Sequence, residues 1–157
     1  MKTEVIDIVS SVERMGARRE DYRQRLRKHQ VSPPLVLVLR LLQSHPGLTM
    51  VELSRRLGIS VPTMQSRMAR LEEQGLISRK RSRDDRRKVP TTLTRRGTSL
   101  LKRVPLAGAG RLLDALETGE VSSRRLRRMA KELEQVERLL FPEEKGPGRR
   151  NTSIWLQ

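Results

Sequence analysis

The chain has 157 residues, of which 34 are lysine or arginine and 18 are aspartate or glutamate, so its formal net charge is +16. This excess predicts an anionic polymer as partner, because the summed field attracts phosphate whatever its sequence; a solubility surface and an acidic membrane are the alternatives. The absence of cysteine excludes disulfides and thiolate redox sensing.

Two further exclusions follow from the composition. Three aromatic residues are too few for base-stacking platforms, which favours double-stranded DNA over single strands as the partner. No secretion signal is apparent, and no apolar run approaches the roughly 20 residues that span a bilayer, so we expect a cytoplasmic protein with no membrane partner.

A first helix is predicted over residues 3–27. Its apolar residues fall on one stripe: Ile8, Val12, Met15, Tyr22 and Leu26. The rest of this helix is heavily basic, which indicates either a solvated face or a secondary phosphate contact.

The start of a second helix is predicted by Ser32, which can cap it, and by the proline at its first position. Residues 35–39 are apolar on all sides, which predicts a central helix that ends at residues 45–47. His29 and His45 are the only histidines. Without cysteine, a zinc site would need carboxylates from distant places, so we expect no metal and no cofactor.

Two helices joined by a short turn follow. Thr49 and Glu52 have the spacing of a capping box, and Gly58 suits the left-handed residue that closes a helix. Ser60 then caps the next helix, and this spacing is typical of a helix-turn-helix.

The second helix of this pair, predicted over residues 61–74, has two distinct faces. One is apolar and consists of Val61, Met64, Met68 and Leu71. The other carries side chains suited to base edges in the major groove, since glutamine pairs with adenine, arginine with guanine, and proline or threonine carbons with the thymine methyl. The predicted contacts are Pro62, Thr63, Gln65, Ser66, Arg67 and Arg70. Ser60 and Thr49, at the two helix starts, are predicted to face phosphates. For each residue the alternative is exposure to solvent without a contact.

A basic hairpin is predicted next, with strands over residues 76–79 and 89–93 and a charged tip between them. A helix beginning at Thr94 follows, so the whole pattern is a winged helix. The predicted DNA contacts of the wing are Arg86, Arg87 and Lys88, with Arg81 and Arg83 as helpers. The alternative is a tip attracted only to the DNA backbone. Pro90 gives no ladder bond, which predicts a shorter or more mobile wing.

The segments 60–63, 71–77, 85–87 and 93–97 resemble the pattern of the MarR family of bacterial transcriptional regulators. The resemblance covers about residues 31–97. The Asp-Arg-Arg of residues 85–87 followed by Leu-Thr-x-x-Gly is fairly specific, whereas many regulators share the helix-turn-helix part.

The resemblance implies several roles. Asp85 would be structural, tying the hairpin through an arginine, and Arg87 would enter the minor groove. The family pairs through its terminal helices, which implies a homodimer. It also implies a small-molecule effector, often a phenolic acid, bound where the dimer helices meet the DNA-binding lobe.

A fifth helix after Gly97 contains Pro105 and the small residues 107–110. Proline removes an amide, so either the helix breaks, or the small residues allow a close approach to another helix or a ligand. We expect a kinked helix with close packing that stops at residues 118–119.

A last long helix is capped by Ser122 or Ser123 and ends at residues 141–142. Its apolar residues form a heptad-like seam: Leu126, Met129, Leu133, Val136 and Leu140. Such a seam packs either inside the chain or in a dimer; we expect dimerisation, together with Ile8, Val12 and Met15 of the first helix.

We therefore expect a mainly α protein: a winged helix-turn-helix with a small β-hairpin wing and long terminal dimerisation helices. The expected parts are an N-terminal dimerisation helix (residues 1–30), the DNA-binding domain (31–97), C-terminal dimerisation helices (98–142) and a basic tail (143–157). The tail suits disorder or a loose backbone contact.

The expected function is a dimeric, sequence-specific regulator of transcription on double-stranded DNA, most simply a repressor of an inverted-repeat operator. No acid–base pair or activated nucleophile is evident, so we expect no enzyme. The alternatives are an architectural or antagonist protein that coats DNA with little sequence preference, an RNA-binding module, and a winged helix that binds only proteins.

Overall fold

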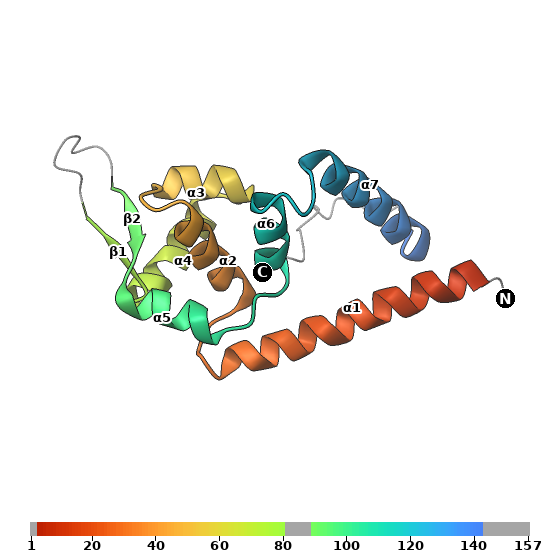
Figure 1. Ribbon diagram of the computed structural model, residues 1–157, viewed down its shortest axis with the longest axis horizontal. Helices are drawn as coiled ribbons and strands as arrows, with labels where there is room; N and C mark the ends of the chain where they lie inside the picture. The colour runs from red at the N-terminus through yellow and green to blue at the C-terminus, as the bar shows by residue number, and fades with distance from the viewer. Residues whose placement is uncertain (1–2, 81–88, 143–157) are drawn as a thin grey trace. The chain divides into compact units, whose positions relative to one another are not determined.

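The computed structural model describes residues 3–80 and 89–142, and within them it has seven helices and one two-stranded antiparallel sheet (Figure 1). The predicted fold class, mainly α with a winged helix and a small hairpin, is confirmed. The chain forms two compact units, residues 1–110 and residues 111–157. None of the helices in the described ranges has both the length and the apolar content needed to cross a membrane.

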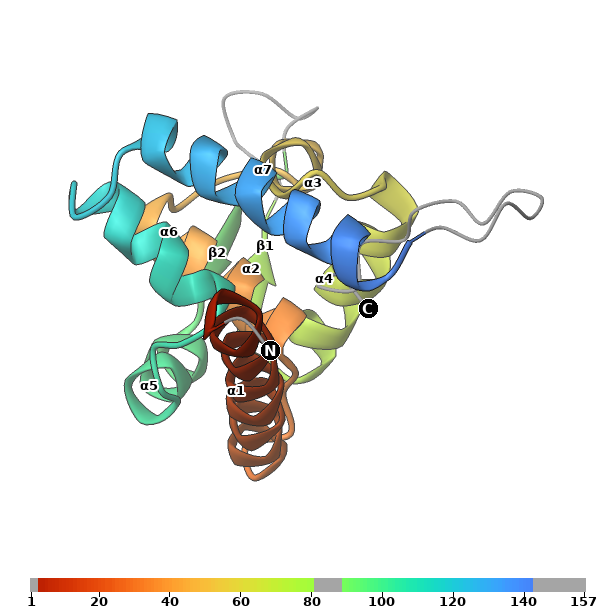
Figure 2. The same ribbon diagram turned by 90° about the vertical axis from the view of Figure 1, so that its right-hand side faces the viewer.

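The first helix, α1 (Thr3–Arg27), is uninterrupted over 25 residues and has the predicted bounds; Figure 2 looks along it. Only Tyr22 and Leu26 are buried, both near the C-terminal end, where α1 contacts α2 (Pro33–Ser44). After α1, Gln30 adopts a left-handed φ of 58°, which turns the chain toward α2.

The helix α2 is the core of the first unit, as predicted for a helix that is apolar on all sides. Seven of its twelve residues are buried, and it contacts β2 (Thr91–Leu93) and α5 (Arg95–Arg103). Each fully buried aliphatic side chain contributes about 1.5–3 kcal/mol, so α2 anchors the elements around it. Ser32 is the N-cap, although its side chain makes no capping hydrogen bond.

The helix-turn-helix consists of α3 (Met50–Leu57) and α4 (Val61–Glu73). Gly58 closes α3 with a left-handed φ of 63°, as predicted. The buried Ser54 donates its hydroxyl to the Ile59 backbone oxygen at 2.5 Å and so holds the turn between the helices. A serine inside a helix has no local signature of this role, so the sequence pattern does not predict it.

The hairpin pairs β1 (Ile77–Arg79) with β2 in antiparallel register, Ile77 opposite Leu93 and Arg79 opposite Thr91. The predicted return strand over residues 89–93 is too long, because Pro90 has no N–H and the strand begins after it. The other edge of β2 is also bonded: the Thr91 N–H donates to the Leu48 oxygen at 3.0 Å, and the Gly47 N–H donates to the Thr91 oxygen at 2.9 Å.

The predicted kinked helix after Gly97 is wrong, because the chain forms two helices, α5 and α6 (Ala109–Glu117). Val104 precedes proline, a position that disfavours helical backbone, and it is extended with φ −88° and ψ 140°. Gly108 then takes a left-handed φ of 60°.

The expected close packing of the small residues is present. A Cβ at Gly108 would lie 3.5 Å from the Tyr22 ring, and one at Gly110 would lie 3.4 Å from the Arg40 Cγ. The Arg40 guanidinium donates to the Leu101 and Val104 oxygens at 2.9 and 3.3 Å. It thereby satisfies carbonyls that the end of α5 leaves free.

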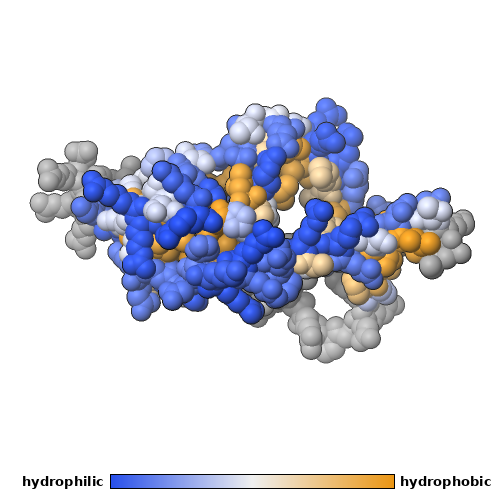
Figure 3. All heavy atoms as spheres, turned by 60° about the horizontal axis from the view of Figure 1, so that its bottom comes forward, coloured by the Kyte–Doolittle hydropathy of each residue, from blue (hydrophilic) through white to orange (hydrophobic). Residues whose placement is uncertain are grey.

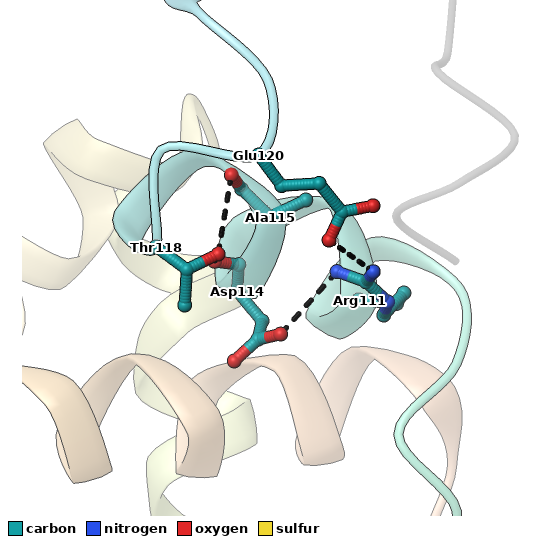
Figure 4. A network of polar contacts seen from close by, with 5 residues as sticks. All are labelled: Arg111, Asp114, Ala115, Thr118 and Glu120. Carbon is teal, nitrogen blue, oxygen red and sulfur yellow. Dashed lines mark hydrogen bonds and ion pairs between the residues drawn. The ribbon is translucent and has the colours of Figure 1, made fainter.

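In the second unit, a polar network closes the turn after α6 (Figure 4). Arg111 donates to the Asp114 carboxylate at 3.3 Å and to Glu120, and Thr118 donates to the Asp114 backbone oxygen at 2.9 Å. The hydrogen bond with Glu120 raises the pKa of the Arg111 guanidinium. This network positions the chain for the last helix.

That helix, α7 (Ser123–Leu140), begins at the first of the two predicted caps: the Ser122 hydroxyl accepts from the Arg125 N–H at 3.2 Å. None of its residues is buried. Along the predicted seam Met129 and Leu133 are exposed, and Leu126, Val136 and Leu140 are half-buried.

Candidate nucleic-acid interface

The start of α3 is fixed by the predicted capping box. The Glu52 N–H donates to the Thr49 hydroxyl oxygen at 3.3 Å, and the Thr49 N–H donates to the Glu52 carboxylate at 2.7 Å. The Thr49 hydroxyl also donates to that carboxylate at 2.8 Å. These hydrogen bonds therefore fix the N-terminal end of α3, which was predicted to face a phosphate.

The start of α4 is capped in a similar way. The Ser60 hydroxyl accepts from the Thr63 N–H at 3.3 Å and lies 2.8 Å from the Thr63 hydroxyl. Pro62 sits in the first turn, where no helical donor is needed. Since helix N-termini attract anions, this exposed cap is a suitable place for a DNA phosphate.

The outward face of α4 is rich in hydrogen-bonding groups. Five of the six predicted groove residues are exposed: Pro62, Thr63, Gln65, Ser66 and Arg70. Val61, which the sequence analysis placed on the buried face, is 41% exposed and joins them. This face can present one guanidinium, one amide, two hydroxyls and aliphatic carbons to a groove.

Arg67 does not lie on this face, and the prediction that it does is wrong. It is 8% exposed, on the buried side with Met64, Met68 and Leu71. Desolvation lowers the pKa of its guanidinium. The reason is helical spacing: position 67 is three residues after Met64 and four before Leu71, so it belongs to the apolar stripe.

The base of the hairpin is locked to the end of α4 through Thr94 and Gly97. The Thr94 hydroxyl donates to the Gly75 oxygen at 2.6 Å and accepts from the Gly97 N–H at 3.0 Å. The Thr94 N–H donates to the Leu76 oxygen at 3.1 Å. A Cβ at Gly97 would lie only 2.1 Å from that oxygen. The Leu-Thr-x-x-Gly motif therefore fixes the wing relative to α4.

The predicted wing residues lie outside the described residues: Arg81, Arg83, Asp85, Arg86, Arg87 and Lys88. At the stem of the hairpin, Arg79 lies 3.8 Å from the Glu72 carboxylate. This ion pair joins β1 to α4, and the sequence analysis did not foresee it because the two residues are on different elements.

The apolar residues assigned to dimerisation stay open to solvent in α1. Ile8 and Met15 are 42% and 46% exposed, and Val12 is half-buried. Three further exposed residues of this surface were not predicted from the sequence, namely Val5, Ile6 and Val9. Figure 3 shows hydrophobic side chains gathered toward the N-terminal end of α1, on a face that is otherwise mainly hydrophilic.

Comparisons with known proteins agree with this geometry. A sequence profile of the MarR family matches residues 29–88. Over this segment, which includes the helix-turn-helix, the chain is similar to the MarR family. The chain is 37% identical over 81 residues to the organic hydroperoxide resistance transcriptional regulator of Bacillus subtilis, a match that covers 52% of this chain and 55% of that protein.

A second relative is the HTH-type transcriptional repressor Rv2887 of Mycobacterium tuberculosis, 37% identical over 70 residues, which are 45% of this chain and 50% of that protein. The chain thus spans about half the length of the curated relatives it matches. The crystal structure of Rv2887, a MarR family protein, aligns with a TM-score of 0.52 and 27% identity over 81% of this chain and 91% of that chain.

A similar fold is seen in the Staphylococcus aureus MepR–DNA complex. That structure aligns with a TM-score of 0.56 and 21% identity, and covers 83% of this chain and 95% of that chain. At this identity the likeness concerns the fold alone.

Proposed function

We propose that this protein is a homodimeric regulator of the MarR family that binds a specific site on double-stranded DNA and represses transcription there. The observation that carries the proposal is the exposed, hydrogen-bonding face of α4, which begins at a capped and open helix N-terminus. The matched relatives are named transcriptional regulators and repressors, and MepR is solved with DNA.

In this proposal α4 enters the major groove. Thr63, Gln65 and Arg70 supply the hydrogen bonds to base edges, while Val61 and Pro62 supply carbon contacts to thymine methyl groups. Ser60 and Thr49 hold the neighbouring phosphates. Arg67 keeps its charge close behind this face without reaching a base edge.

The wing would extend the contact along the duplex. Arg86, Arg87 and Lys88 reach the adjacent backbone or minor groove, Arg81 and Arg83 assist, and Asp85 orders the hairpin. Residues 31–97 act as the DNA-binding part, residues 1–30 and 98–142 provide the dimer helices, and residues 143–157 form a basic tail.

The dimer would form through the open apolar surfaces of α1 and α7. Two copies of α4 then lie about one helical turn, or 34 Å, apart, which suits an inverted repeat. Relief of repression by a small molecule, which the family resemblance implies, is part of the same proposal. It requires a ligand that binds with different affinities to two states of the dimer, which differ in the spacing of their DNA-binding lobes.

The test is binding of the purified protein to the DNA upstream of its own gene and to a scrambled duplex of equal length. Fluorescence anisotropy at several salt concentrations gives both affinities and the salt slope. We expect a specificity ratio of about a thousand or more, with one dimer per site. Comparable affinities with a steep salt slope would instead support an architectural protein that binds by counterion release, and tighter binding to RNA would support an RNA-binding module.

A further inference from the structure

A small basic hollow lies in the first unit, where the chain after α1, the end of α4 and one side of α5 come together. Its volume is about 190 Å³. The buried side chains of Leu76 and Leu100 form its apolar part, and the rest of its lining is polar or basic.

Three permanent cations line this hollow, namely Lys28, Arg96 and Arg103, together with His29. No aspartate or glutamate is among the lining residues. Within residues 3–80 and 89–142, none of the three cations forms an ion pair with a carboxylate. Like charges placed together without a counter-charge repel one another, and a bound dianion would remove that repulsion.

A glutamine completes the polar wall of the hollow. Gln74 lines the hollow, and its Nε2 donates to the Gln30 oxygen at 2.8 Å. Its Oε1 is buried and accepts no hydrogen bond from the part of the chain that is described. That oxygen has almost no accessible surface, so it lies behind the wall of the hollow and offers no contact to a ligand.

The size and chemistry together define the ligand. Ordinary small-molecule sites measure about 300–1,000 Å³, so this hollow suits a phosphate group with only a few further atoms. Arginine and lysine are the usual partners of phosphate. We propose that the hollow binds a small phosphate ester, with its phosphate held between Lys28, Arg96 and Arg103.

The position of the hollow gives such a ligand a regulatory consequence. Its phosphate joins the end of α1 to α5, and Thr94 at the start of α5 is bonded to Gly75 at the end of α4. Occupancy thus fixes α1 relative to α4. The resulting change in DNA affinity rests on the proposed function, whereas ligand binding itself does not.

DNA is the other possible source of a phosphate. The hollow adjoins Gln74 at the C-terminal end of α4, whereas the predicted contacts begin at its N-terminal end. Thirteen residues at about 1.5 Å each separate those ends by roughly 20 Å. The hollow therefore stays open when the first turns of α4 occupy a groove, which favours the free ester.

The experiment measures binding by the full chain without DNA. Glycerol 3-phosphate and inorganic phosphate are titrated by calorimetry and by thermal shift, with sodium chloride at equal ionic strength and with glycerol as references. We expect a saturable rise in melting temperature with glycerol 3-phosphate, a weaker one with inorganic phosphate, and none with the references.

Two double variants locate the site. Arg96→Gln with Arg103→Gln removes two charge-assisted contacts and should raise the Kd for glycerol 3-phosphate by at least about tenfold. Arg95→Gln with Lys102→Gln removes the same charge from the same helix, at exposed residues outside the hollow, and should leave the Kd unchanged. All four residues are exposed, so both variants should fold.

Three outcomes would overturn the proposal. Equal losses in both variants would mean non-specific attraction of anions. A thermal shift that sodium chloride reproduces would mean screening only. Loss of DNA affinity in the Arg96/Arg103 variant, without any binding of glycerol 3-phosphate by the unmodified protein, would assign these arginines to the DNA backbone.

Discussion

At the scale of single residues, two threonines three positions apart have opposite hydrogen-bonding states. The Thr94 hydroxyl both donates and accepts a hydrogen bond at the base of the hairpin. The Thr91 side chain is fully buried, and its hydroxyl has no hydrogen-bond partner among the described residues. The Thr91 backbone N–H and C=O are both hydrogen-bonded, so Thr91 contributes its shape and its backbone rather than its hydroxyl.

We predict that Thr91→Val raises the free energy of unfolding by about 1 kcal/mol, because it removes a buried hydroxyl without a partner and keeps the branched shape. Thr94→Val is the matched control and should lower that free energy by about 1–2 kcal/mol through loss of the cap. Urea denaturation at one protein concentration measures both. Equal destabilisation by the two changes would show that the Thr91 hydroxyl has a partner.

Gly97 is required by space rather than by backbone conformation. We predict that Gly97→Ala lowers the free energy of unfolding by about 1–3 kcal/mol, because the new Cβ overlaps the Leu76 backbone oxygen and α5 must shift. Gly16→Ala, inside α1 with nothing within 4 Å of its Cβ, should raise it by about 0.5–1 kcal/mol. A neutral Gly97→Ala in the same urea series would mean that α5 moves freely relative to Leu76.

At the scale of elements, α4 divides its arginines between two environments. Arg70 is exposed and free to reach a base edge, whereas Arg67 is held in the buried stripe. The distinction matters for mutagenesis, since loss of a buried arginine removes packing as well as charge.

We predict that Arg70→Ala weakens binding to the specific duplex by roughly 1–3 kcal/mol and relaxes selection at one base position. The measurement is anisotropy with specific and scrambled duplexes. Lys102→Ala removes the same charge from an exposed site on α5 and should weaken both duplexes slightly and equally. If Arg70→Ala behaves like that control, Arg70 contributes only its charge.

At the scale of the whole molecule, α1 and α7 both carry apolar side chains that are open to solvent. Leu133 is 53% exposed in α7 and Ile8 is 42% exposed in α1. Burial of such an open apolar stripe stabilises the helix that carries it. In a two-fold dimer the same residue is buried in both copies of the chain.

We therefore predict that Leu133→Glu converts the proposed dimer to monomers. Losing about 1.5 kcal/mol per buried leucine in each of two copies raises the dimer Kd at least about 100-fold. Sedimentation equilibrium gives this constant directly. Gln135→Glu adds the same charge to α7 beside the seam and should leave the Kd nearly unchanged; a similar shift in both variants would place the interface elsewhere.

Local sequence signals predicted most of the helices and strands. The caps at Thr49, Ser60 and Ser122 were predicted and are present, whereas the side chain of Ser32, also predicted to cap, makes no capping hydrogen bond. The reason is that a cap joins groups only three residues apart, so its residue types and spacing are visible in the chain itself. The uninterrupted α1 and the central α2 follow in the same way from their apolar periodicity.

The errors arose where one segment meets another. The sequence pattern placed Val61 inside and Arg67 outside on α4, and the structure reverses both. The spacing of the apolar residues predicts one continuous buried stripe along α4, but burial also depends on which part of α4 is covered by other elements. Pro105 indicates the break between α5 and α6 in the sequence itself. The close approach of Gly108 to Tyr22, and the hydrogen bonds from Arg40 to the end of α5, join residues more than 60 positions apart and have no such local signal.

The sequence by itself determined the helix-turn-helix, the hairpin and the basic character of this protein, because hydrogen bonds and charges within a few residues define them. Only the tertiary structure decided which arginine of α4 is buried, why residue 97 is glycine, and where Lys28, Arg96 and Arg103 come together. Those outcomes depend on desolvation and steric contact between segments far apart in the chain, and no local pattern encodes them.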